Sequence, residues 1–217
     1  LFDADIYGPN IPLMLGASGP PAARDNKLIP LEAHGVKLMS MGFLADENTP
    51  MIWRGPMVHG AIRQLLRETD WGELDYLVVD LPPGTGDAPL TLIQSVPLSG
   101  VVLVTTPQDV ALLDGVKGIR MFRKLNVPIL GLVENMSGFV CPNCHHETAI
   151  FTKGGGEKEA ARQKLTFLGA IPLDPAIAQG GDKGVPLVVG QPNSPQTKAL
   201  RWLAQIVAGQ ISIANMK

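Results

Sequence analysis

Apolar runs of strand length alternate with amphipathic stretches along most of the chain. Continuous apolar strands separated by helices are typical of a parallel sheet that is covered on both faces. We therefore predict an α/β fold with a mostly parallel sheet. The predicted strands are Val36–Phe43, Tyr76–Asp80, Val101–Thr105, Ile129–Glu134 and Phe167–Ile171, and the predicted helices are Gly55–Asp70, Ala88–Ser95, Val110–Leu125, Glu157–Lys164 and Pro195–Gly209.

The pattern predicts one domain over residues 1–217. Proline and glycine are spread through the connections, and we find no internal repeat or low-complexity linker. A chain of 217 residues buries roughly 70% of its unfolded surface, so it needs neither disulfide nor metal to fold. Residue 1 is Leu, and Leu1–Asp5 reads as the tail of a strand already in progress. We expect an upstream segment to be missing.

Charge and hydropathy exclude some classes of partner. The net charge is −2 and no Lys/Arg-rich block occurs, so nucleic-acid binding is not indicated. The longest apolar stretches have the length of strands, and none resembles a membrane span or a signal peptide. We predict a cytoplasmic protein that does not bind membranes.

Acidic residues follow the predicted strands, at the edge of the sheet where ligands of α/β proteins bind. Asp3 and Asp5 are two positions apart, which points both side chains to the same side of an extended segment. Asp80 closes an apolar run, an arrangement that holds a Mg²⁺-bound water. The following loop, Leu81–Asp87, combines stiff prolines with permissive glycines and is suited to hinge when a phosphate arrives. An aspartate that only caps a helix remains the alternative for each residue. Together they favour a nucleotide site.

Both cysteines of the chain lie in the tetrapeptide Cys141-Pro142-Asn143-Cys144. A two-residue gap lets both sulfurs reach one metal ion or iron–sulfur cluster, or close on each other as a disulfide. Two thiolates fill half of a tetrahedral site. The other half must come from other side chains, from a client, or from the same loop of a second subunit.

Three other interpretations of this tetrapeptide stay open. With His145 it matches the pattern for covalent haem attachment, although the chain shows no export signal. A redox pair would place its first cysteine at a helix start, which the following residues do not resemble. A structural zinc would use Cys141, Cys144 and one or both of His145 and His146.

Seven motifs follow one another along the chain: LFDADIYGPNIPLMLG, WRGPM, DYLVVDLPPGTGD, VTTPQ, ENMSGFVCPNC, GGGEK and FLGAIPLDP. Taken in this order, they resemble the Mrp/ApbC family of iron–sulfur cluster carriers, which are P-loop ATPases of the MinD/ParA kind. They cover nearly the whole chain. The resemblance implies a MinD/ParA-like P-loop NTPase fold that is truncated at its N-terminus.

The resemblance also implies roles for particular residues. Asp3 and Asp5 would belong to the first switch segment, and Asp5 would help to orient the attacking water. The residues that would bind nucleotide are the Walker B carboxylate Asp80, the second-switch residues Pro82, Gly84 and Gly86, the adenine-reading Asn135, and Pro172 and Asp174 beside the base and ribose. Cys141 and Cys144 would bridge two subunits through a shared [4Fe–4S] cluster, with zinc as a possible occupant in aerobic preparations.

One motif of the family is absent from these residues. The family carries a glycine-rich GKGGVGKS-type phosphate loop some tens of residues before the position of Asp3, and no such sequence occurs here. Gly154–Lys158 lacks the Walker spacing and its Ser/Thr, and is instead predicted to open a helix. We expect the first strand, the phosphate loop and the first helix to be missing, and the chain alone to hydrolyse ATP poorly or not at all.

The sequence thus predicts a homodimeric carrier that transfers a [4Fe–4S] cluster to apoproteins and uses ATP and Mg²⁺. The alternative is a MinD/ParA-like positioning switch with a structural zinc at the cysteines. A membrane-targeting switch would end in a basic amphipathic helix, whereas residues 209–217 contain a single cation, Lys217.

Overall fold

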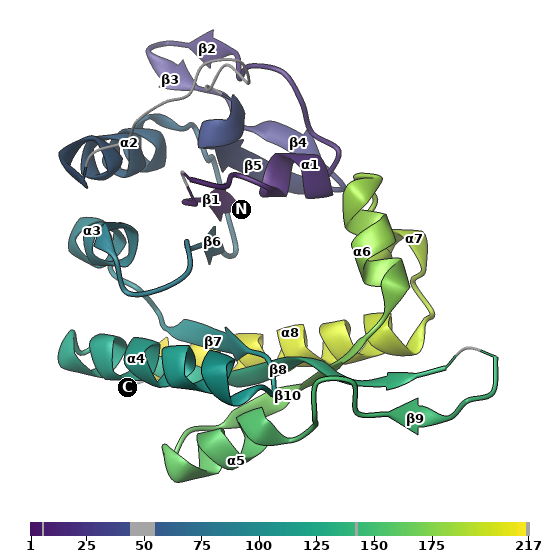
Figure 1. Cartoon of the computed structure of the whole chain (residues 1–217). Helices are drawn as coiled ribbons and strands as arrows, with labels where there is room; N and C mark the ends of the chain where they lie inside the picture. Colours follow the sequence, from purple (N-terminus) through teal and green to yellow (C-terminus); the bar gives the residue numbers. More distant parts are fainter. Residues whose placement is uncertain (6, 44–54, 142, 216–217) are drawn as a thin grey trace. The chain divides into compact units, whose positions relative to one another are not determined.

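The computed structural model describes residues 1–5, 7–43, 55–141 and 143–215, and the chain forms two compact units. Unit 1 comprises Leu1–Pro97 and Gln179–Val189, and unit 2 comprises Leu98–Ala178 and Gly190–Lys217. Figure 1 labels the helices and strands of both units. Trp53 and Arg54 of the WRGPM motif and Pro142 of the cysteine tetrapeptide lie outside the described residues.

Unit 1 is built on a four-stranded sheet of order β4-β5-β1-β6 (Figure 1). The central strand β1 runs parallel to both β5 and β6, whereas β4 is antiparallel to β5. The strands of this sheet are β1 (Phe2–Asp3), β4 (Leu31–Ala33), β5 (Val36–Ser40) and β6 (Val79–Asp80). A separate two-stranded hairpin consists of β2 (Ala23–Arg24) and β3 (Lys27–Leu28). The helices are α1 (Ile11–Met14), the 3-10 turn Met41–Phe43, α2 (Gly55–Glu68) and α3 (Asp87–Ser95).

The core of unit 1 forms around β1. Phe2 is fully buried, and its ring meets that of Trp71 edge-on at a centroid distance of 6.5 Å. The neighbouring strand β5 contributes Leu38 and Met39, and α2 contributes Ile62, all of them buried. Pairing with β5 on one side and β6 on the other, together with the burial of Phe2, fixes the position of the residues that follow Phe2.

The predicted strand Tyr76–Asp80 is wrong over its first three residues, because β6 contains only Val79 and Asp80. The only described partner of β6 is β1, which offers just Phe2 and Asp3 to the ladder. Tyr76 and Val78 are consequently exposed, at 51% and 61%. Apolar composition predicted a full strand, but without a longer partner the hydrogen-bond ladder ends early.

Unit 2 contains a parallel sheet of order β10-β8-β7, with the short β9 antiparallel to β8 (Figure 1). Adjacent residues of β8 face opposite sides. Leu132 packs with Ile119 of α4 and Ala160 of α5, whereas the core around Val133 includes Leu203 of α8. The elements are β7 (Val101–Thr105), α4 (Asp109–Lys124), β8 (Ile129–Val140), β9 (Glu147–Thr148), α5 (Gly155–Arg162), β10 (Phe167–Leu173) and α8 (Pro195–Asn215).

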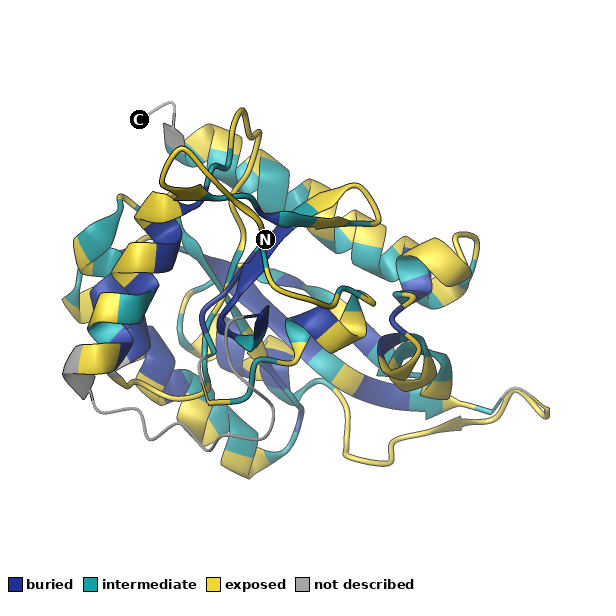
Figure 2. Ribbon diagram, turned by 90° about the horizontal axis from the view of Figure 1, so that it is seen from above, coloured by how far each residue is buried: buried dark blue, intermediate teal, exposed yellow. Residues whose placement is uncertain are grey.

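Helices therefore cover both faces of the sheet in unit 2, and the predicted α/β class with mostly parallel strands is confirmed. Buried residues concentrate on strands and on inward helix faces (Figure 2). The described chain adds α6 (Pro175–Asp182), which begins in unit 2 and ends in unit 1, and α7 (Leu187–Gly190). Neither was predicted, because both are short and rich in glycine or valine.

The predicted strand Ile129–Glu134 is too short. In the structure β8 continues to Val140, past Asn135, Ser137 and Gly138. Residue types that usually end a strand are tolerated because the ladder with β10 is interrupted there and then resumes. This extension carries the cysteines away from the body of the sheet.

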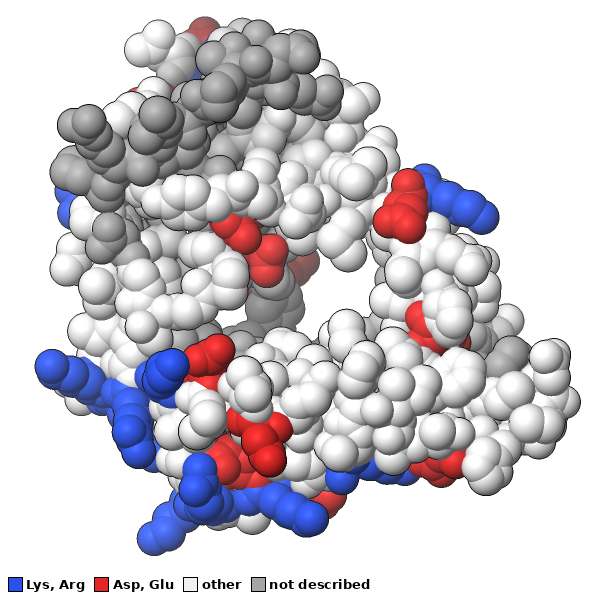
Figure 3. Space-filling view, viewed as in Figure 1, with Lys and Arg blue, Asp and Glu red and all other residues white. Residues whose placement is uncertain are grey.

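Lys and Arg side chains are exposed at the C-terminal ends of two helices of unit 2. Lys and Arg gather at the ends of α4 and α5 (Figure 3), whose last turns carry Arg123, Lys124 and Arg162. Cations at helix C-termini complement the helix dipole. Among the described helices, none is both long and apolar enough to cross a membrane.

Candidate functional site

The carboxyl ends of three neighbouring strands in unit 1 bring Asp3, Ser40 and Asp80 into one row. In the parallel ladder, Asp3 of β1 lies opposite Ser40 of β5 on one side and opposite Asp80 of β6 on the other. This is the sheet edge at which the sequence predicted a nucleotide site. The structure therefore places two of the predicted carboxylates in adjacent strands.

Asp3 is held rigidly. Its side chain is buried, its Oδ2 accepts a hydrogen bond of 2.8 Å from the Ser40 hydroxyl, and its Oδ1 accepts one of 3.1 Å from the Asp5 amide. The Ser40 hydroxyl also accepts from the amide of Gly42 at 2.9 Å. A buried carboxylate that is fixed by a chain of hydrogen bonds is pre-oriented towards the end of the strand.

Burial and like charge perturb the acids of this edge. Desolvation raises the pKa of Asp3 to about 6, against the lowering effect of its two hydrogen bonds, and the charges of Asp80 and Asp5 add to the rise. The pKa of Asp80 is also raised, first by desolvation and then by Asp5. Carboxyl groups that repel one another at a strand edge favour an approaching cation such as Mg²⁺.

Asp5 shapes the start of the next segment. Its Oδ1 accepts hydrogen bonds of 3.2 Å from the amides of Tyr7 and Gly8. This geometry fits the alternative in which an aspartate organises a turn. The catalytic assignment of Asp5 stays a prediction.

The loop after β6 leads into α3. Gly84 has φ +90°, a conformation that favours glycine, whereas a Cβ at Gly84 or Gly86 would meet no atom within 4 Å. Gly86 is the N-cap of α3. Pro82 is half-buried and the residues from Pro83 to Gly86 are exposed. The backbone is thus open to a ligand here, as the prediction of a switch segment requires.

A second group of predicted residues lies along β8 and β10 in unit 2, where Asn135 stands inside β8, which continues to Val140, and not at the end of that strand. The ladder pairs Asn135 with Ile171, which places Pro172 beside Asn135. The Asn135 side-chain oxygen accepts from the Met136 amide at 2.9 Å, so its NH₂ group is turned to other partners. Asp174 begins α6 by accepting a 2.8 Å hydrogen bond from the Ala176 amide. Asn135 and Pro172 are thus neighbours within the sheet, and Asp174 directly follows β10.

The cysteines lie in a turn between β8 and β9. Phe139 pairs with Thr148 and Val140 with Glu147, and residues 139–148 form what we name the cysteine hairpin. The Cys141 amide donates to the His146 carbonyl at 3.0 Å, and the His145 amide donates to the Cys141 carbonyl at 2.9 Å. Both thiols are free, Cys141 half-buried and Cys144 exposed.

The turn favours a thiolate at Cys141. Hydrogen bonds from the Cys144 and Asn143 amides, and then from the Cys144 thiol, lower the pKa of Cys141. Within the described part of the chain, no three His, Cys, Asp or Glu residues are grouped to hold a metal ion. The described hairpin thus offers two sulfur ligands, half of a tetrahedral site, and gives no support to a zinc site completed by its own histidines.

Two residues that organise these sites were missed in the sequence. Ser40 is fully buried beside Asp3, and the available signal was a hydroxyl that closes an apolar strand. Glu134 is fully buried on β8, and the signal was a carboxylate directly before Asn135. Strand-end reasoning was applied to aspartates alone, and it would have found Ser40 at the end of β5 as well.

Comparison with known proteins relates most of the chain to one family. Residues 1–208 match the model described as ParA, NUBPL iron-transfer P-loop NTPase. The iron–sulfur cluster carrier protein of Synechocystis sp. is 52% identical over all of this chain and 63% of its own length. The iron–sulfur cluster transfer protein NUBPL of Dictyostelium discoideum is 51% identical over 99% of this chain and 68% of its own. The chain thus spans about two thirds of the length of these relatives.

Solved structures with a similar fold include nucleotide-binding proteins. A nucleotide-binding protein from Archaeoglobus fulgidus, in complex with ADP, shares 40% identity and a TM-score of 0.72 over 84% of this chain and 72% of its own. The septum site-determining protein MinD of Pyrococcus horikoshii, complexed with Mg-ADP, has a TM-score of 0.65 and 20% identity over 98% of this chain and 84% of its own. The second likeness shows the fold alone, and together the comparisons confirm the MinD/ParA-like fold class.

Proposed function

Because the chain belongs to the ParA family of NUBPL iron-transfer P-loop NTPases, we propose that it is part of an iron–sulfur cluster carrier. The carrier binds a [4Fe–4S] cluster and passes it to apoproteins, and ATP binding and hydrolysis are coupled to that transfer. The names of the relatives from Synechocystis and Dictyostelium support this proposal.

The observation that carries the proposal is the geometry of the cysteine hairpin. Two free thiols stand at the turn of the cysteine hairpin, whose first strand is the end of β8, and backbone amides stabilise Cys141 as a thiolate. Thiolates are the ligands that iron–sulfur clusters prefer. An exposed Cys144 leaves the cluster open to a client protein, which suits a carrier better than a permanent cofactor.

Two ligands per chain imply a shared site. A two-fold axis beside Cys141 and Cys144 would combine two hairpins into a four-cysteine cluster site. We therefore propose a homodimer in which the cluster bridges the subunits, and zinc would satisfy the same four sulfurs in aerobic preparations. Release would then follow from a change in how the subunits dock.

Roles in nucleotide binding are proposed for each unit by itself. In unit 1, Asp80 would hold Mg²⁺ through a bound water, Asp5 would orient the attacking water with Asp3 in the same switch segment, and Pro82, Gly84 and Gly86 would respond to the γ-phosphate. In unit 2, Asn135 would read the adenine, with Pro172 and Asp174 beside base and ribose. The raised pKa values of Asp3 and Asp80 support the binding of a cation at the sheet edge of unit 1.

No phosphate-loop sequence occurs within the 217 residues. Without the loop amides and its lysine, the β- and γ-phosphates lose the contacts on which phosphoryl transfer depends. We propose that coupling to ATP needs a phosphate loop in addition to these residues, and that the chain alone binds the cluster without appreciable hydrolysis. One domain over residues 1–217 likewise stays a prediction.

The test is anaerobic reconstitution with iron and sulfide, followed by measurement of iron and of oligomeric state. Wild type should take up about two iron atoms per chain, because four irons are shared by two subunits. Cys141→Ala and Cys144→Ala should each lose the cluster, while His145→Ala, in the same turn, should retain it. Iron uptake that is unchanged by Cys141→Ala would overturn the assignment.

A further inference from the structure

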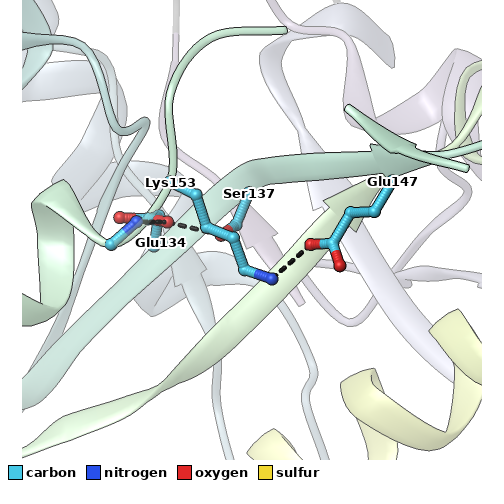
Figure 4. Close-up of polar contacts among 5 residues, drawn as sticks. Glu134, Ser137, Glu147 and Lys153 are labelled. Atoms are coloured by element: carbon cyan, nitrogen blue, oxygen red, sulfur yellow. Dashed lines mark hydrogen bonds and ion pairs between the residues drawn. The ribbon is translucent and has the colours of Figure 1, made fainter. Parts of the chain in front are cut away.

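Glu134 lies at the centre of a network that joins three segments of unit 2. It is fully buried on β8, and its carboxylate accepts three hydrogen bonds, of which Figure 4 shows the one from Ser137. The donors are the Ser137 hydroxyl at 2.5 Å, the Gly154 amide at 2.9 Å and the Gly156 amide at 2.6 Å. Charge-assisted bonds of this kind in a buried site are among the strongest in proteins.

The bond to Ser137 closes a bulge in β8. The ladder with β10 pairs Asn135 with Ile171 and resumes at Phe139 with Leu173, so residues 136–138 lie opposite Pro172 alone. Met136 and Gly138 have φ of +57° and +72° within this bulge. A bulge redirects the strand that follows it. The geometry of residues 136–138 therefore determines where the cysteine hairpin points.

The bonds to Gly154 and Gly156 attach the start of α5 to the same carboxylate. Gly154 has φ +81°, and a Cβ on Gly155 would lie 2.6 Å from the Pro107 carbonyl oxygen. A Cβ on Gly156 would lie 3.0 Å from Cβ of Glu134. The three consecutive glycines thus allow the backbone to approach Glu134 and expose two amides to it.

A third contact links this segment to the hairpin itself. Lys153, directly before Gly154, forms an ion pair with Glu147 of β9 (Figure 4). Both side chains are about half exposed, so the pair contributes little by itself. It shows, however, that the segment held by Glu134 continues into contact with the second strand of the hairpin.

We propose that Glu134 is a positioning residue that sets the direction of the cysteine hairpin. It fixes the β8 bulge through Ser137, and it fixes the start of α5, which follows the hairpin, through Gly154 and Gly156. Since Asn135 is the next residue of β8, the same network ties the proposed base-reading position to the thiols. The proposal rests on the proposed function for what the hairpin carries, but the order of the hairpin can be measured without a cluster.

Two substitutions separate the parts of the network. Glu134→Gln keeps the shape but replaces one acceptor by an NH₂ donor, so at least one of the three donors faces another donor. Ser137→Ala removes only the bond across the bulge and leaves both glycine bonds in place. The matched control is Glu159→Gln, which removes a buried carboxylate from α5 whose described partners are Arg162 and Gln163.

The first measurement is hydrogen–deuterium exchange of the metal-free protein. Glu134→Gln should accelerate exchange of the amides in residues 136–156 about tenfold, and Ser137→Ala should do so in residues 139–148 alone. Glu159→Gln should leave residues 139–148 as in wild type. Unchanged hairpin exchange in folded Glu134→Gln and Ser137→Ala, or equal acceleration in Glu159→Gln, overturns the proposal.

The second measurement follows the cluster after reconstitution with iron and sulfide. Ser137→Ala should load as much iron as wild type, lose it to an iron(II) chelator about fivefold faster, and show an altered EPR signal on reduction. Equal loss rates and identical EPR signals for wild type and Ser137→Ala overturn the proposal. If wild type itself takes up no cluster, the carrier function fails while the exchange experiment still decides the role of Glu134.

Discussion

The Ser40 hydroxyl donates a 2.8 Å hydrogen bond to Oδ2 of Asp3, and both side chains are buried at the ends of adjacent parallel strands. The bond alone does not compensate for burial, because the pKa of Asp3 is still raised to about 6. Asp3 is therefore a group whose ionisation near neutral pH costs folding free energy, as expected of a residue placed for a bound cation or a reacting water.

Replacing Asp3 by Asn should stabilise the protein above pH 6. The folded-state pKa of Asp3 is about 6 and its ordinary value is 3.8, so between these values only the folded state holds the proton. Stability of wild type is fully present below about pH 3.8 and falls as pH rises through this window. The Asp3→Asn variant does not lose stability in this window, and its free energy of unfolding at pH 7 should exceed that of wild type by about 1–2 kcal/mol after allowance for solvent screening. Urea unfolding at pH 4 and 7 measures the difference. Parallel stability curves for the two proteins would contradict the assigned pKa.

Ser40→Ala should have the opposite effect. It removes the bond to Asp3 and the acceptor for the Gly42 amide, which should cost about 1–3 kcal/mol at pH 7 and raise the pKa of Asp3 further. A double-mutant cycle isolates the pair, because Ser40→Ala should cost less when residue 3 is Asn. Equal costs in both backgrounds would mean that the hydroxyl acts only through Gly42.

Sequence patterns predicted the elements that local periodicity and turn residues define. The helix Ala88–Ser95 and the strand Val101–Thr105 are found almost as predicted. Periodicity fails where strand pairing decides how long a strand is. β6 is confined to Val79 and Asp80 because its described partner is short, and β8 continues past Asn135 because a bulge interrupts the ladder without ending it.

The candidate site shows the same division. Asp3 and Asp80 were predicted because they close apolar runs, a signal present in the sequence itself, whereas Asn135 was implied by the family resemblance. The hydrogen bonds that position Asp3 and Glu134 were not predicted, since Ser40 meets Asp3 across 37 positions and Glu134 meets Gly156 across 22. Hydrogen bonds between segments so far apart depend on strand register, which composition does not specify.

Cys141 should react as a thiolate at lower pH than an ordinary cysteine. Amide hydrogen bonds from Cys144 and Asn143 lower its pKa from 9.0, so the thiolate fraction at neutral pH rises. In Cys144→Ala both amides remain, and iodoacetamide should modify Cys141 with a pH midpoint below that value. The same variant unfolded in guanidinium chloride is the control, because the turn is lost. Identical midpoints in the folded and unfolded protein would contradict the role of the turn.

Hydrolysis of ATP by the 217-residue chain should be at background level. The strand-edge carboxylates cannot replace the loop amides and lysine that hold the phosphates in a P-loop NTPase. Phosphate release with Mg²⁺ and ATP should be the same for wild type and Asp80→Asn. Magnesium-dependent turnover that Asp80→Asn abolishes would show that these residues form a competent site by themselves.

Two glycine-to-alanine substitutions test the close contact at Glu134. A Cβ on Gly156 would lie 3.0 Å from Cβ and 3.1 Å from Oε2 of Glu134, and 3.1 Å from Leu132. Gly156→Ala should therefore destabilise the protein by about 1–3 kcal/mol, despite the better helix propensity of alanine. Gly209 of α8 has no atom within 4 Å of the same position, so Gly209→Ala should stabilise by about 0.5–1 kcal/mol. Chemical denaturation of both variants gives the comparison. Helix propensity alone favours alanine at either position. A gain in stability from both substitutions would therefore mean that α5 does not approach Glu134 in solution, whereas changes in stability of opposite sign would place the crowding at the carboxylate.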